Sequence, residues 1–182
     1  MHKIFQVSLI ILSLVFGSPV FARNTDRTVY LNRVITMQSV SIVISAINEL
    51  ELGDTLYLHI DSPGGEVNAG DKLMDVMKRS RGTIVAVLDG QTASKAVDIA
   101  LTAHKVIMGD SRGETVIHEA YVIAGLFRLH NIDERTNSIE QRQIKLYHHI
   151  ITEKEERKVF LDHEDLRMTN EQFIHRINHH VR

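Results

Sequence analysis

The feature that most constrains this chain is the alternation of strand-like and helix-like segments between residues 28 and 108. Three strand-like segments are separated by two segments whose apolar residues recur at helical spacing. The strand-like segments are TVYLNRVI (28–35), DTLYLHI (54–60) and GTIVAVL (82–88), and the helix-like segments are 37–50 and 68–80. This alternation predicts right-handed β-α-β crossovers and a largely parallel sheet, so the fold class is α/β.

The first 22 residues have the character of a secretory signal peptide. Lys3 precedes an uncharged apolar stretch, and the segment closes on Val-Phe-Ala at positions 20–22, a small-x-small cleavage pattern. The apolar run is short for a bilayer span, which needs about 20 residues. We therefore expect an exported protein, periplasmic or secreted, that would be membrane-attached only if the segment stayed uncleaved.

The composition of the remaining chain, 23–182, predicts a single globular domain. Removal of residues 1–22 would take away Lys3 and no acid, so the formal charge would change from −2 to −3. The sequence contains no basic stripe of the kind that would indicate a nucleic-acid partner. Cysteine is absent from the sequence, which excludes disulfides, thiol nucleophiles and thiolate metal sites.

The C-terminal part is more polar. Residues 132–158 contain neither glycine nor proline and predict one long, exposed helix. Thr169 and Gln172 have the spacing of a capping box and predict the start of a terminal helix over 169–180. His175 and His179 have i, i+4 spacing, but a solvated polar face accounts for them and we expect no metal site.

Three loops at predicted strand ends carry residues suited to acyl-transfer chemistry. Gly64 and Gly65 lie in DSPGGEV, Ser94 opens a helix in DGQTASKA, and His118 ends VIH. Each residue alone has an ordinary structural interpretation: a tight turn, an N-cap or a structural histidine. Together they supply oxyanion donors, a nucleophile and a base at one edge of the sheet.

These motifs, in this order, resemble the proteolytic subunit of Clp protease (ClpP). SPGG is followed, 29 residues after its second glycine, by the serine of GQTAS, and 24 residues later by the histidine of VIH. The resemblance covers residues 28–177. It implies the ClpP/crotonase fold, a stack of β-β-α units with a C-terminal helix, and a long helix around 133–157 that resembles the handle through which two rings stack.

The resemblance also assigns roles to individual residues. It implies Ser94 as nucleophile, His118 as general base, and the N–H groups of Gly64 and Lys95 as oxyanion donors, with Gly65 beside them in the substrate-binding loop. The orienting acid is Asp165, because DLRMTNEQF resembles the family's stretch of Asp, apolar turn, cap and helix. Asp162 and Glu164 are the alternatives.

The chain departs from the family pattern around the serine. Lys95-Ala96 replaces the usual Met-Gly, Asp98 replaces an apolar residue, and Ala120 replaces a proline two residues after the histidine. A buried, unpaired Asp98 would be costly, so we expect it to pair with Lys95 or to face solvent.

The sequence thus predicts a serine peptidase with a Ser-His-Asp triad and no cofactor. Its expected partners are peptides or unfolded proteins, and the resemblance implies a homo-oligomeric ring. An exported compartment lacks ATP, so we expect cleavage without a Clp ATPase. A catalytically silent oligomeric scaffold or peptide-binding protein is the alternative, and a crotonase-type acyl-CoA enzyme is the third possibility.

Overall fold

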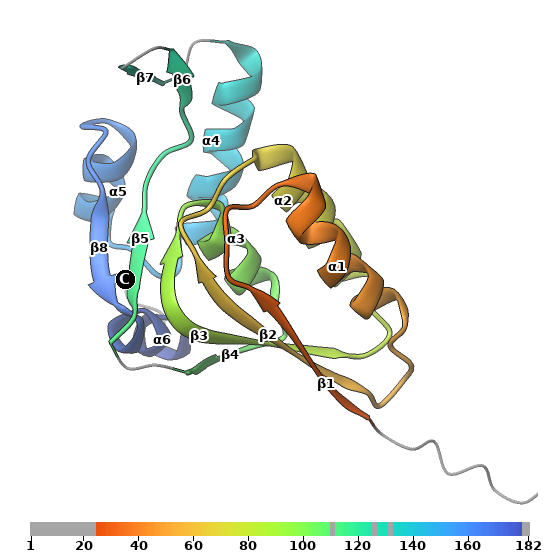
Figure 1. Ribbon diagram of the computed structural model, residues 1–182. Coiled ribbons are helices and arrows are strands. Elements are labelled where there is room, and N and C mark those ends of the chain that lie inside the picture. The colour runs from red at the N-terminus through yellow and green to blue at the C-terminus, as the bar shows by residue number, and fades with distance from the viewer. Residues whose placement is uncertain (1–24, 110–111, 125–126, 131–132, 180–182) are drawn as a thin grey trace, which may run out of the picture.

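Six strands form the main sheet of the computed structural model, which describes residues 25–109, 112–124, 127–130 and 133–179 (Figure 1). The predicted signal segment, 1–22, lies outside the described residues. The strand order is β1-β2-β3-β5-β8, with β4 also paired to β3. The strands are β1 (Asp26–Leu31), β2 (Thr55–Ser62), β3 (Thr83–Ala93), β4 (Lys105–Met108), β5 (Glu114–Ile117) and β8 (Leu166–Thr169).

The long strand β3 organises this sheet. It pairs in parallel with β2 on one side; on the other it pairs with β4 over Val85–Leu88 and then with β5 at Thr92 and Ala93. Residues 84–88 of β3 are buried, as the continuous apolar run predicts. Only β8 runs antiparallel, against β5. The mainly parallel α/β sheet predicted from the sequence is therefore confirmed.

Three helices lie in succession beside the parallel strands (Figure 1). Helix α1 (Met37–Asn48) packs on α2 (Val67–Lys78), and α2 packs on α3 (Lys95–Thr102). Their inward faces join the strands in one hydrophobic core. This packing fixes the loops at the carboxyl ends of β2, β3 and β5, where α/β proteins place their sites.

The segment predicted as one long helix over 132–158 is instead two helices, so that expectation is wrong in this detail. Helix α4 (Glu134–Tyr147) ends before a turn, and α5 (Glu153–Phe160) follows it. Ile150 and Ile151 turn inward and are buried, and the Thr152 and Glu155 side chains form a capping box that starts a new helix. Core burial at the turn overrides the helical composition of the segment.

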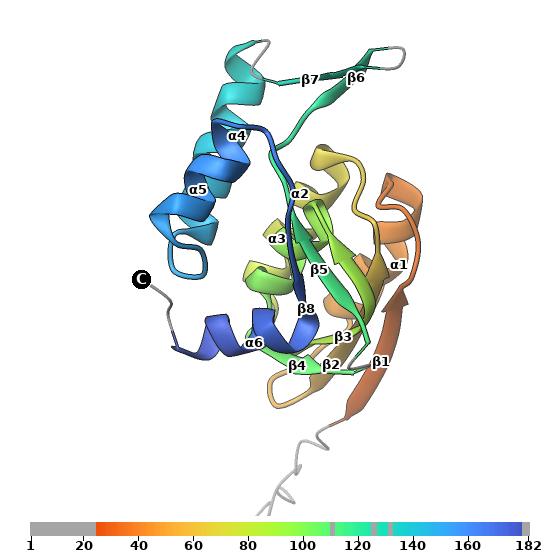
Figure 2. The same cartoon turned by 90° about the vertical axis from the view of Figure 1, so that its left-hand side faces the viewer.

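Two smaller features complete the chain. Strands β6 (Val122–Ala124) and β7 (Phe127–Leu129) form an antiparallel pair that stands apart from the main sheet, near the start of α4 (Figure 2). Helix α6 (Asn170–His179) follows β8. The predicted capping box is confirmed, because Thr169 N–H donates to Gln172 Oε1 at 2.9 Å and Gln172 N–H donates to Thr169 Oγ1 at 3.1 Å.

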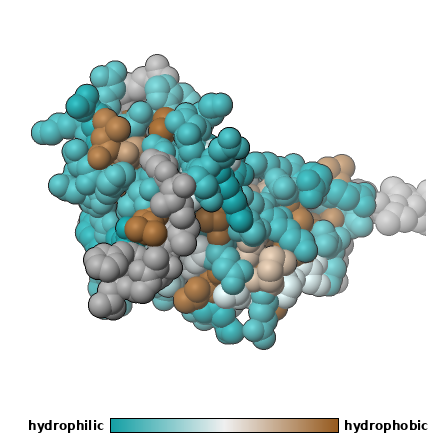
Figure 3. All heavy atoms as spheres, turned by 90° about the horizontal axis from the view of Figure 1, so that it is seen from above, coloured by the Kyte–Doolittle hydropathy of each residue, from teal (hydrophilic) through white to brown (hydrophobic). Residues whose placement is uncertain are grey.

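The surface is mainly polar where it is seen from above, with separate hydrophobic patches rather than one continuous one (Figure 3). Within the part of the chain that the structure describes, no helix combines the length and the apolar character needed to cross a bilayer.

Candidate active site

Ser94 lies at a sharp turn between β3 and α3. Its backbone has φ 54° and ψ −126°, a region that non-glycine residues rarely adopt. Its N–H donates to the carbonyl oxygen of Val116 in β5 at 2.9 Å, which ties the turn to the neighbouring strand. Its side chain makes no capping hydrogen bond to α3. A helix cap therefore does not explain this serine, whereas a strained strand-to-helix turn is the geometry that presents a nucleophile.

Gly64 packs directly against this turn. A β-carbon built on Gly64 would lie 2.7 Å from Cβ of Ser94 and 2.8 Å from the carbonyl oxygen of Ala93. Gly64 also has φ +93°, a conformation that favours glycine. The first predicted loop therefore meets the second at the serine, and glycine is the residue that permits this approach.

The backbone N–H groups around Ser94 differ in whether they already donate a hydrogen bond. Lys95 is the first residue of α3, so its N–H is one of the donors that an α-helix leaves unpaired. Gly64 N–H donates to Ser62 Oγ at 3.2 Å. Among the hydrogen bonds of the described residues, Gly65 N–H donates none. Gly65 packs against the backbone of Ile35, whereas Gly64 packs against Ser94, so Gly64 and Lys95 stay the predicted oxyanion donors.

His118 follows the last residue of β5, at the same edge of the sheet as Ser94. Ala93 of β3 pairs with Val116 of β5, so the chain leaves both strands within a few residues. His118 Nδ1 lies 2.8 Å from the carbonyl oxygen of Glu119. Because a carbonyl oxygen can only accept, Nδ1 carries the proton, which leaves Nε2 as the acceptor in the neutral ring. That tautomer is the one a general base needs.

Asp165 lies at the start of β8 and contacts arginine rather than His118. Its Oδ2 accepts from Arg167 at 2.9 Å, and its Oδ1 lies 3.6 Å from Arg128. Of the alternative acids, Glu164 pairs with Lys158 at 3.1 Å. Within the described residues no carboxylate is hydrogen-bonded to His118. The structure thus brings Gly64, Ser94 and the end of β5 together, and the triad of Ser94, His118 and Asp165 stays a prediction.

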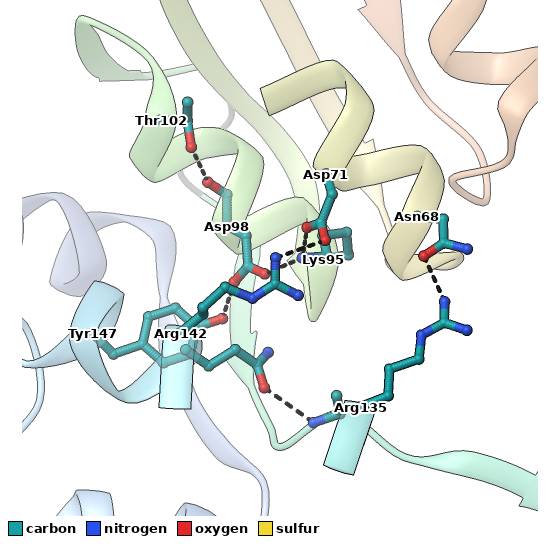
Figure 4. A network of polar contacts seen from close by, with 10 residues as sticks. Asn68, Asp71, Lys95, Asp98, Thr102, Arg135, Arg142 and Tyr147 are labelled. Atoms are coloured by element: carbon teal, nitrogen blue, oxygen red, sulfur yellow. Dashed lines mark hydrogen bonds and ion pairs between the residues drawn. The ribbon is translucent and has the colours of Figure 1, made fainter. Parts of the chain in front are cut away.

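The Lys95 side chain lies in a polar network between α2, α3 and α4 (Figure 4). Its Nζ donates to Asp71 Oδ1 at 2.8 Å and to Asp98 Oδ2 at 2.7 Å. Asp98 is only 1% exposed, and its second carboxylate oxygen accepts from the Tyr147 hydroxyl. The expected pairing of Lys95 with Asp98 is confirmed, and the lysine and aspartate at the departures from the family pattern form one buried ion pair.

The network joins three helices and shifts the pKa values of its members. Burial is the largest single effect on Asp71 and Lys95 and opposes their charged forms, but their partners together outweigh it. Lys95 and Arg142 lower the pKa of Asp71, and Asp98 and Asp71 raise the pKa of Lys95. Burial and the Asp98 charge raise the pKa of Tyr147 well above its usual value. Arg142 of α4 adds a contact to Asp71 at 3.0 Å.

The cost of burying an unpaired Asp98 pointed to Lys95 as its partner, but nothing in the sequence pointed to Asp71, Arg142 or Tyr147. These residues come from α2 and α4, and no local pattern links them to α3. A cavity of about 540 Å³ lies over the network, with Lys95 and Asp98 in its wall. Gln143 in the same wall accepts from Ala120 N–H at 3.1 Å and so reaches the segment just after His118.

Comparison with known proteins shows the family of the chain and a solved structure with a similar fold. The family model described as Clp protease matches residues 20–173. Among solved structures, a mutant of ClpP1 from Listeria monocytogenes is similar in fold, with a TM-score of 0.65 and 21% sequence identity over 80% of this chain and 84% of that one. The match to the family covers most of the sequence, and the chain belongs to the Clp protease family.

Proposed function

We propose that this chain is a serine peptidase in which Ser94 is the nucleophile and His118 is the general base. The observation that carries the proposal is the backbone of Ser94, which is held in a strained conformation while its side chain caps nothing. Strain of about 1–3 kcal/mol persists only where the surrounding structure imposes it. Membership of the Clp protease family supports peptide hydrolysis as the reaction in which this serine takes part.

The proposed reaction follows from the placement of these groups. Ser94 Oγ attacks the peptide carbonyl carbon while His118 Nε2 takes the hydroxyl proton. The oxyanion is bound by the N–H groups of Lys95 and Gly64, and Gly64 N–H must first leave Ser62 Oγ, to which it donates at 3.2 Å. The C–N bond then breaks, the proton passes to the leaving amine, and water hydrolyses the acyl-enzyme by the same route in reverse.

Asp165 is proposed as the acid that orients His118 in the active state. To do so, its carboxylate must exchange Arg167 for His118 Nδ1, and that ring nitrogen must leave the carbonyl of Glu119. The resemblance to ClpP supports a ring of identical subunits. The predicted signal segment supports an exported enzyme that cleaves short or unfolded peptides without an ATPase.

A catalytically silent scaffold is the second candidate. It is favoured by the same two contacts, because His118 bonded to Glu119 and Asp165 bonded to Arg167 do not form a triad. A scaffold would retain the family fold and the oligomer while lacking turnover.

Peptide hydrolysis separates the two candidates. The oligomeric fraction of the purified protein is assayed without ATP against a library of fluorogenic peptides and an unfolded protein. We expect cleavage that falls by more than about 10³-fold in Ser94→Ala, as for loss of a triad nucleophile. The matched control is Ser41→Ala, which removes an exposed serine of α1. Cleavage that survives Ser94→Ala would exclude the proposed nucleophile, and an assembled oligomer without cleavage would favour the scaffold.

A further inference from the structure

A second cluster of chemically capable side chains lies next to His118. Glu119 follows β5, His130 follows β7, and His163 lies in the turn between α5 and β8. Glu119 Oε2 lies 2.5 Å from His163 Nδ1 and 2.9 Å from His130 Nδ1. The two imidazole rings stack with centroids 4.4 Å apart. Three segments that are distant in sequence therefore converge on one carboxylate.

The cluster has more ligand capacity than its internal contacts use. The Glu119 side chain is only 1% exposed, yet its Oε1 is buried without a hydrogen-bond partner. His130 Nδ1 is likewise buried and forms no hydrogen bond, because its approach to the carboxylate lacks the required geometry. An unpaired buried carboxylate oxygen is costly, and native proteins rarely leave one without a protein, water or ion partner.

A cation between the three side chains would remove this cost. One ligand atom from each residue lies within 4.8 Å of the others. Ligand atoms about 2.0–2.2 Å from a tetrahedral ion are separated by about 3.4 Å, so a modest outward shift of the present contacts would admit one. Two imidazoles and a carboxylate are a donor set typical of Zn²⁺, with a fourth position left for water.

We propose that Glu119, His130 and His163 form a binding site for a divalent transition-metal ion, with Zn²⁺ the best fit to the donor set. The site does not depend on the proposed peptidase activity. If the chain is a peptidase, the position of the metal site would also link it to the catalytic residues. Glu119 supplies the carbonyl oxygen that holds His118 Nδ1, and His163 precedes Asp165 by two residues. A bound ion would tie together the segments that carry the predicted base and the predicted acid.

The competing explanation is a cluster of ion pairs between the buried carboxylate and protonated histidines. It accounts for the two short contacts to Glu119 Oε2 but leaves Glu119 Oε1 without a partner. It also predicts no selective affinity for a metal, so metal binding distinguishes the two explanations.

The test is metal binding to untagged protein after treatment with EDTA and dialysis. Co²⁺ is titrated while its visible absorption is recorded, and Zn²⁺ is then used to displace it. We expect one saturable site per chain with the strong visible bands of four-coordinate Co²⁺. Glu119→Gln and His163→Asn should each weaken binding by at least about tenfold, the effect that even outer-shell ligand partners have. Asparagine suits the left-handed backbone of His163, φ 57°, so this variant is expected to fold.

The matched control is the double variant His175→Asn, His179→Asn. These histidines face each other on α6 with ring centroids 4.4 Å apart and are the histidine pair outside the cluster with chelating i, i+4 spacing. We expect the double variant to bind as the unaltered protein does. The proposal would be overturned if the α6 double variant lost metal binding. It would also be overturned if Glu119→Gln and His163→Asn bound the metal as the unaltered protein does. Circular dichroism of each variant confirms that loss of binding is not loss of fold.

Discussion

Gly64 faces Ser94 so closely that a β-carbon on the glycine would lie 2.7 Å from the β-carbon of the serine. Real β-carbons essentially never approach so closely. Two loops that are separated in sequence by α2 and β3 therefore meet at Ser94. The positive φ of both residues means that the turn is held by its neighbours rather than by local preference.

Gly64→Ala is expected to damage the site more than the fold. The new methyl group must displace the Ser94 turn, so we expect labelling or turnover at Ser94 to fall by at least about 10²-fold, the loss typical of a misplaced reacting group. Gly53→Ala is the control, because Gly53 also has a positive φ, 96°, but lies before β2 whereas Gly64 follows it. Equal activity losses in the two variants, measured beside urea unfolding, would contradict a specific role for Gly64.

The residue that orients His118 can be identified by comparing the kcat values of three single variants. If Asp165 moves to His118 in the active state, Asp165→Asn should lower kcat by about 10⁴-fold, as for an altered triad acid. Asp162→Asn and Glu164→Gln should leave kcat within about twofold, since surface changes away from the reacting groups have small effects. Steady-state peptide hydrolysis measures all three. A large loss in either control and none in Asp165→Asn would move the role to the other residue.

Arg167 should restrain that exchange rather than assist it. It holds Asp165 Oδ2 at 2.9 Å, and both side chains are at least partly exposed. Exposed pairs of this kind are worth about 0–1 kcal/mol, so Arg167→Gln should raise kcat by up to about fivefold with little change in stability. A loss of activity in Arg167→Gln, with the fold intact by circular dichroism, would show that the arginine contributes to the site.

The free energy of unfolding should fall strongly when one member of the Lys95–Asp98 pair is replaced, and less when both are replaced. Lys95→Met leaves Asp98, which is 1% exposed, without its cation, and we expect the free energy of unfolding to fall by about 3–5 kcal/mol. In Lys95→Met, Asp98→Leu a large part of that loss should return, because no uncompensated charge remains. Urea denaturation of the two single variants and the double variant measures the coupling. Additive losses would contradict the buried ion pair.

Stability should be flat at neutral pH and fall at both extremes. Hydrogen bonds and Arg176 outweigh burial and lower the pKa of Glu155, and Lys95 does the same for Asp71. These groups stabilise the protein above their usual values of 4.5 and 3.8, and that contribution is lost as pH falls through their lower folded pKa values.

At alkaline pH the sign is reversed. The pKa values of Lys95 and Tyr147 are raised from 10.5 and 10.0, so their stabilisation is complete below those values and is lost as pH rises through the folded ones. Thermal unfolding followed between pH 2 and 12 should therefore show a plateau, and Tyr147→Phe should lessen the alkaline decline. An unchanged alkaline decline in Tyr147→Phe would contradict the raised pKa of the tyrosine.

The sequence was most informative where local pattern and burial agree. The continuous apolar run of β3, the capping box at Thr169 and the glycine pair before α2 all lie where their residue types predict. The single helix over 132–158 was mispredicted because composition does not show that Ile150 and Ile151 are buried. Asp71, Tyr147 and the Glu119 cluster were missed because tertiary contacts bring them together. Asp71 is 24 positions from Lys95, Tyr147 is 49 from Asp98, and His163 is 44 from Glu119.

The most direct test of the account is the reactivity of Ser94 itself. The purified protein is treated with a fluorophosphonate probe, and the modified residue is located by mass spectrometry, with His118→Ala as the matched variant. We expect a single adduct on Ser94 that is lost in His118→Ala, since an unassisted serine hydroxyl is a weak nucleophile. An assembled protein in which Ser94 stays unmodified would exclude Ser94 as an activated nucleophile and leave a catalytically silent member of the family.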